Sequence, residues 1–150
     1  VMDVMNPTAE HYLLPHSGTF SANPMSMVAG LTAMTHFDEA AVEHVNALAT
    51  RAMRGIDEAA RRTGARACVT GGGSILRVHM KESPPRNFRE AYLTPEENER
   101  LKAMLEHLFH AGFVMINTCS AMMSTPMAEC DIDALVAAMG EGFEKIAKMP

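Results

Sequence analysis

The stretch from Asp38 to Gly64 constrains the fold most strongly. Its apolar residues recur at spacings of three and four, the period of a helix with one buried face. Asp38 is a favourable N-cap residue and Gly64 a typical stop signal, so one long amphipathic helix is predicted between them. Other elements must cover its apolar stripe, which consists of Val42, Val45, Leu48, Ala49, Ala52, Met53, Ile56 and Ala60.

Two strands are predicted to follow this helix, over residues 67–70 and 74–80, because apolar and more polar side chains alternate in the second. The glycines at 71–73 are expected to form a turn or bulge between the strands. They do not match a nucleotide-binding fingerprint, which requires a helix directly afterwards. Residues 82–93 are expected to form a loop.

The C-terminal half is predicted to contribute further helices and short strands. Thr94 and Glu97 have the spacing of a capping box, which predicts a helix that ends at Gly112. Two short strands, at 113–116 and about 120–123, and a last helix over 129–147 complete the pattern. Helices on one face of a small, mostly antiparallel sheet would bury these stripes, so the expected fold class is α/β, as an α+β small domain. The expected core includes Leu48, Met53, Leu76, Val78, Leu105, Leu108, Leu135 and Met139.

The composition excludes several classes of protein. The 150 residues are 47% hydrophobic and 21% charged, as in an ordinary soluble globular domain. A net charge of −5 argues against nucleic acid or an anionic membrane as partner. Three widely spaced cysteines form neither a disulfide framework nor a zinc pattern, so reduced thiols and a cytoplasmic location are expected. His107 and His110 are spaced for a metal pair, but surface histidines are the favoured interpretation because no third ligand is near.

A polar loop precedes a second, very apolar helix. Asn23 is a suitable N-cap and Pro24 suits the first helical position. The helix is apolar on nearly every side as far as about Thr35 and is therefore expected to be buried. In the loop, Gly18 allows a tight turn before the Thr19 hydroxyl, and a hydroxyl beside free backbone N–H groups can bind an anion. The alternative is an ordinary loop that binds nothing.

The segment from His16 to Gly30, with its pattern GT…NP…AG, resembles class III pyridoxal-phosphate (PLP) aminotransferases. Within that class it is most similar to glutamate-1-semialdehyde aminomutase and the β-amino-acid aminotransferases. The resemblance extends more loosely over the whole chain and implies the C-terminal domain of a fold-type I PLP enzyme. Residues 1–36 would be the end of the large PLP-binding domain and the start of the connecting helix, and residues 37–150 the small domain.

The resemblance also implies a cofactor, a partner and a reaction. In the family the threonine holds the PLP phosphate of the neighbouring subunit, which makes Gly18 and Thr19 the expected cofactor-binding residues of a homodimer. The reaction would move an amino group between a small-molecule donor and acceptor through Schiff-base intermediates. Aminotransferase and aminomutase cannot be separated, because both use the same cofactor site.

No lysine here stands in the context that the family's Schiff-base lysine has. That lysine lies upstream of the matching segment, so no catalytic residue is assigned and this segment alone is expected to be inactive. An upstream catalytic large-domain segment is needed, on the same or a separate polypeptide. The alternative function is a stand-alone, non-catalytic α+β binding or dimerisation module. The lysines present are Lys81, Lys102, Lys145 and Lys148.

One departure from the family concerns the substrate. Some relatives that act on β-amino acids carry an arginine, which grips the substrate carboxylate, in the turn that matches residues 117–119. Here the turn is Asn-Thr-Cys. A thioester, an amide or a carrier-bound acyl group could therefore take the place of a free carboxylate.

Overall fold

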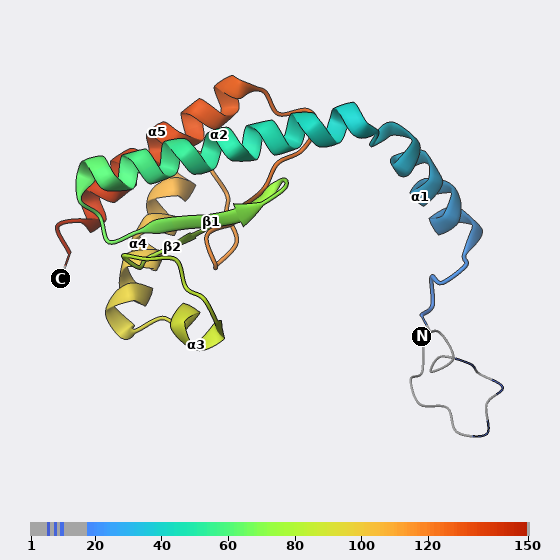
Figure 1. Cartoon of the computed structure of the whole chain (residues 1–150), viewed down its shortest axis with the longest axis horizontal. Helices are drawn as coiled ribbons and strands as arrows, with labels where there is room; N and C mark the ends of the chain where they lie inside the picture. Colours follow the sequence, from blue (N-terminus) through green and yellow to red (C-terminus); the bar gives the residue numbers. More distant parts are fainter. Residues whose placement is uncertain (1–5, 7, 9, 11–17, 150) are drawn as a thin grey trace. The chain divides into compact units, whose positions relative to one another are not determined.

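A computed structural model describes residues 6, 8, 10 and 18–149 of the chain. The chain divides into two compact units, residues 1–38 and residues 39–150 (Figure 1). The first unit contains helix α1 (Pro24–His36), and the second contains the sheet and all the other helices that the structure describes.

The second unit is built on helix α2 (Glu39–Thr63). It begins directly after Asp38 and ends before Gly64, whose φ of +68° is the left-handed conformation of a helix stop. The predicted helix and its boundaries are confirmed. Its buried side chains are Val45, Leu48, Ala49, Ala52, Ile56, Ala59 and Ala60.

Three strands form one antiparallel sheet in the order β1–β2–β3. Strands β1 (Cys68–Gly72) and β2 (Ile75–His79) make a hairpin, and Gly73 at its turn has a φ of +58°, which favours glycine. Strand β3 (Ser120–Met122) pairs with the other side of β2. The small antiparallel sheet is as predicted.

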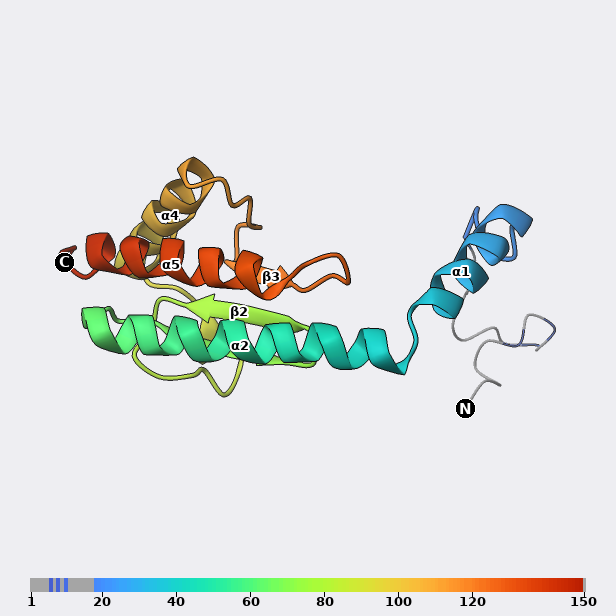
Figure 2. The same cartoon turned by 90° about the horizontal axis from the view of Figure 1, so that it is seen from above.

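Helix α2 and helix α5 (Glu129–Ile146) run side by side and cover one face of the sheet (Figures 1 and 2). Helix α4 (Pro95–His110) packs against α5. The predicted capping box of α4 is present, with Thr94 and Glu97 bonded to each other's backbone N–H. Of the predicted core, Met53 and Leu105 are only partly buried. The other six are buried: Leu48, Leu76, Val78, Leu108, Leu135 and Met139.

Two local predictions were wrong. Residues 113–116 are not a strand, although Phe113 and Met115 pack on the core while Val114 and Ile116 are exposed. The alternation is that of a strand, but this segment pairs with no strand that the structure describes, and a strand requires a ladder partner.

The expected loop at 82–93 contains a short helix, α3 (Phe88–Ala91), because the Asn87 side chain caps its first turn.

The burial predicted for α1 is also contradicted. The helix forms as expected, with Pro24 in its first turn and the Asn23 side chain accepting hydrogen bonds from the N–H groups of Met25 and Ser26. However, none of its residues is buried, and Leu31 is 71% exposed. Local signals start a helix, whereas burial requires a partner surface, and the described part of the chain supplies none for α1.

Candidate functional site

The predicted cofactor residues lie in the turn that leads into α1. The N–H of Ser21 donates to the carbonyl of Gly18 at 3.0 Å, and the N–H of Asn23 donates to that of Phe20 at 3.2 Å. A Cβ at position 18 would lie 3.0 Å from the hydroxyl oxygen of Ser21, whose exposed side chain can rotate away. The structure thus brings Gly18 and Thr19 together on one exposed turn.

The donors of this turn are compatible with a phosphate. Thr19 is exposed, and its hydroxyl and N–H make no hydrogen bond to any residue that the structure describes. By contrast, the N–H groups of Met25 and Ser26 are already taken by Asn23, so the helix start itself offers fewer donors than a bare N-terminus. A phosphate bound here would therefore contact the Thr19 side of the turn rather than the first turn of α1.

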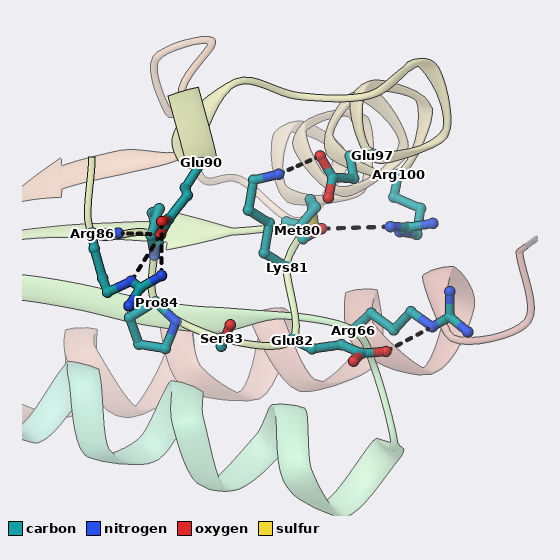
Figure 3. Close-up of a pocket in the computed structure, with 11 residues that line it drawn as sticks. Arg66, Met80, Lys81, Glu82, Ser83, Pro84, Arg86, Glu90, Glu97 and Arg100 are labelled. Carbon is teal, nitrogen blue, oxygen red and sulfur yellow. Dashed lines mark hydrogen bonds and ion pairs between the residues drawn. The ribbon is translucent and has the colours of Figure 1, made fainter. Parts of the chain in front are cut away.

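A second candidate site is a polar cavity of about 720 Å³ beside the end of β2. Its wall contains four cationic and three acidic side chains. Figure 3 shows each of the carboxylates paired with a cation, whereas Arg100 is directed at the carbonyl of Met80. Lys81 pairs with Glu97 at 2.6 Å, and the more exposed Arg86 pairs with Glu90 at 3.0 Å. The cavity is therefore lined by ion pairs that join the 81–93 segment to itself and to α4. The remaining charged wall residues are Arg66, Glu82 and Arg100.

Lys81 contributes the lysine of this cavity wall, and its environment is not that of a nucleophile. Its Nζ donates to the Glu97 carboxylate and, at 3.1 Å, to the carbonyl of Tyr92. A lysine nucleophile is activated by an apolar pocket or by a neighbouring cation, and Lys81 has two acceptors instead. Burial opposes ionisation of Glu97, but hydrogen bonds from Lys81 and from the backbone N–H of Thr94 to its carboxylate keep the pKa of Glu97 below its usual value.

The two histidines of α4, His107 and His110, differ in their surroundings. His107 lies between α4 and α5, where Nε2 is 2.9 Å from the carbonyl oxygen of Ala138 and Nδ1 is 2.8 Å from Lys145 Nζ. It is therefore an interhelical contact and not the surface residue expected, whereas His110 is exposed. No group of residues in the described part of the chain has the arrangement of a metal centre.

Sequence reasoning missed a polar cluster on the sheet face that is turned away from α2. Arg77 on β2 lies between Thr70 on β1 and Ser120 on β3, because the three are register partners. His79, two residues along β2, is buried and accepts from or donates to the Thr70 hydroxyl at 2.8 Å. The available signal was the alternation in β2, which places Arg77 and His79 on the same face.

Comparisons with known proteins show which proteins the chain resembles. No family model matches it. A glutamate-1-semialdehyde 2,1-aminomutase of Desulforudis audaxviator (strain MP104C) is 29% identical over 144 residues, covering 94% of this chain and 33% of the relative. The protein of the same name from Anaeromyxobacter dehalogenans (strain 2CP-1 / ATCC BAA-258) is 30% identical over 149 residues, which cover 98% of this chain and 34% of the relative.

Solved structures agree. An omega-transaminase from Sphaerobacter thermophilus superposes with a TM-score of 0.84 at 32% identity, over 98% of this chain and 33% of its own. The chain matches the C-terminal part of a class III aminotransferase. A transaminase with PLP bound gives a TM-score of 0.76 at 27% identity over 97% and 33% of the two chains. A beta-phenylalanine aminotransferase from Variovorax paradoxus gives a TM-score of 0.71 at 26% identity, over 93% of this chain and 32% of its own.

The chain spans about a third of the length of the curated relatives it matches. Its α/β fold is that of the C-terminal domain of a fold-type I PLP enzyme. None of the helices in the described residues is long and apolar enough to cross a bilayer.

Proposed function

We propose that this chain is the C-terminal segment of a PLP-dependent aminotransferase or aminomutase that works as a cytoplasmic homodimer. The observation that carries the proposal is the TM-score of 0.84 to an omega-transaminase over nearly the entire chain. In this proposal residues 1–36 complete the large PLP-binding domain and begin the connecting helix, and residues 37–150 form the small domain. The substrates are a small-molecule amino donor and acceptor, or a carrier-bound acyl group.

Gly18 and Thr19 would hold the cofactor phosphate across the dimer interface. PLP, when bound, supplies an electron sink for moving an amino group. The role of this chain is to bind and orient it: a phosphate with close to two negative charges requires donors that are already in place. The exposed Thr19 hydroxyl and N–H are such donors, on a tight turn anchored by the capped helix α1.

The exposed apolar surface of α1 supports a role inside a larger protein. Five of its large apolar side chains are more than 60% exposed. A large exposed apolar surface usually marks a site of interaction with another surface. In the complete enzyme this surface would pack within the large domain. The residues are Met25, Met27, Val28, Leu31 and Met34.

The second candidate function, a stand-alone binding or dimerisation module, is favoured by the second unit. Residues 39–150 have a hydrophobic core of their own, formed by α2, α4, α5 and the sheet. Under this alternative the Thr19 turn would be an ordinary loop.

Cofactor binding separates the two functions. The 150-residue chain mixed with PLP is expected to show no stoichiometric visible absorbance, because none of its lysines stands where the family's lysine does. Co-production with a lysine-bearing large-domain segment is expected to give a complex that retains PLP through gel filtration and transfers an amino group. Stoichiometric colour in the chain alone, lost on mutation of one lysine, would overturn the assignment of catalysis to an upstream segment. The lysines to mutate are Lys81, Lys102, Lys145 and Lys148.

A further inference from the structure

Arg77 is a cation without a counter-charge in the part of the chain that the structure describes. It is half-buried in the middle strand of the sheet, and its Nε atom is fully buried without a hydrogen-bond partner. No carboxylate of the described residues forms an ion pair with it. A buried guanidinium N–H that is left unpaired is costly, so this arrangement favours a ligand that accepts hydrogen bonds.

The neighbours of Arg77 offer hydroxyl donors and no negative charge. Thr70 and Ser120 flank it on the adjacent strands, where register partners have Cβ atoms about 4.5–5.5 Å apart. The Ser120 hydroxyl is 2.9 Å from that of Thr118, and only one of these two O–H groups can be used in their mutual bond. The other O–H group can donate to a ligand bound at this part of the sheet.

Two titratable groups whose pKa values respond to the charge of Arg77, His79 and Cys119, are held uncharged at neutral pH. Burial, followed by the positive charges of Arg77 and Lys81, lowers the pKa of His79. Burial raises the pKa of the Cys119 thiol to about 12, against the opposing effect of Arg77. At neutral pH neither group supplies the missing negative charge.

We propose that Arg77, together with the Ser120–Thr118 hydroxyl pair, forms a carboxylate-binding site on the sheet face turned away from α2. An arginine fork and one hydroxyl match the two oxygens of a carboxylate. The inference deepens the proposed function, because the ligand would then be the carboxylate of the amino donor or acceptor. The same chemistry could come from an aspartate or glutamate of the polypeptide that covers this face, so the experiment has two arms.

The first arm does not depend on the proposed function. The ¹⁵N-labelled 150-residue chain is titrated with sodium acetate against sodium chloride at constant ionic strength, and the arginine Nε–H resonances are followed. The Arg77 resonance, assigned by its loss in Arg77→Lys, should shift and saturate. The resonance of Arg54, which is exposed on α2, is the matched control and should not shift specifically. An Arg77 response no larger than that of Arg54 would overturn the proposal.

The second arm identifies the source of the carboxylate in the complete enzyme. If the ligand is the substrate, Arg77→Met should raise KM for a 2-oxo acid relative to an aldehyde without a carboxylate by about ten- to a hundredfold, with partial rescue in Arg77→Lys. If it is a protein side chain, both KM values should stay unchanged while the melting temperature falls. An unchanged KM ratio with an unchanged melting temperature would overturn the proposal. If the complete polypeptide had no transaminase activity, the proposed function would be contradicted. The acetate titration would then decide alone whether Arg77 binds a carboxylate.

Discussion

Helices α1 and α2 are adjacent in the sequence, and both begin where the sequence predicts. They differ in how their apolar residues are arranged. In α2 the apolar residues form one stripe that packs on α5 and the sheet, whereas α1 is apolar on nearly every side and has no buried residue. Caps and spacing are local and suffice to start both helices. Burial depends on a partner surface, and only α2 has one among the described residues.

The largest effect should come from emptying the core. Phe143 on α5 is fully buried, so Phe143→Ala is expected to cost about 3–5 kcal/mol of unfolding free energy, as measured by urea denaturation. The matched change in α1 is Leu31→Ala, which should cost less than about 0.5 kcal/mol in this chain because Leu31 is exposed. Equal costs for the two variants would show that α1 is buried after all.

Glycine-to-alanine changes compare the packing of α5 with that of α1. A Cβ at Gly142 would lie 2.5 Å from Met104 Sδ and 2.9 Å from His107 Cδ2, and both side chains are enclosed between helices. Gly142→Ala should therefore destabilise the second unit by about 1–3 kcal/mol. A Cβ at Gly30 meets nothing within 4 Å, so Gly30→Ala should stabilise α1 by about 0.5–1 kcal/mol. Circular dichroism and urea denaturation measure both, and a stabilising Gly142→Ala would disprove the close approach of α4 and α5.

Removing the helix caps of α4 and α1 should affect different parts of the molecule. Thr94→Ala removes half of the capping box of α4 and should lower the unfolding free energy of the second unit by about 1 kcal/mol. Asn23→Ala removes the cap of α1 at a similar local cost of about 1 kcal/mol. In this chain it should reduce helicity without moving the main unfolding transition, because α1 is not part of that core. If Asn23→Ala lowered the urea midpoint of the main unfolding transition as Thr94→Ala does, the division of the chain into two units would be contradicted.

His79, in the second unit, should make stability depend on pH. Burial lowers the pKa of His79, so the unfolded chain binds the His79 proton more tightly than the folded one. Stability should be greatest above about pH 6.5, the pKa of an unperturbed histidine, and decline as the pH falls through the range down to the folded pKa. Urea midpoints between pH 8 and 5 should show this decline in the parent and less of it in His79→Gln. An identical pH profile in both would remove His79 as its source.

What could be predicted from the sequence was local. The capping box of Thr94 and Glu97 requires only neighbours in the sequence and is correct. The predicted glycine turn is correct for Gly73, whereas Gly71 and Gly72 extend strand β1. The strand predicted at 113–116 failed because a strand also needs an edge to pair with. The polar cluster around Arg77 became visible only when the register placed Thr70 and Ser120 on either side of it. The Gly18–Thr19 site stays a prediction, since its ligand would come from another subunit.

Cofactor retention in the homodimeric enzyme that the proposed function implies tests the account most directly. Thr19→Ala should speed PLP loss by about ten- to a hundredfold, since a hydrogen bond to a charged group contributes about 1.5–3 kcal/mol. Its melting temperature without cofactor should stay near that of the parent, because Thr19 is exposed and lies outside the core. Asn23→Ala is the matched control and should behave oppositely, lowering stability while affecting PLP only indirectly. If Thr19→Ala retains PLP as tightly as the parent, this turn does not hold the phosphate and the account is wrong.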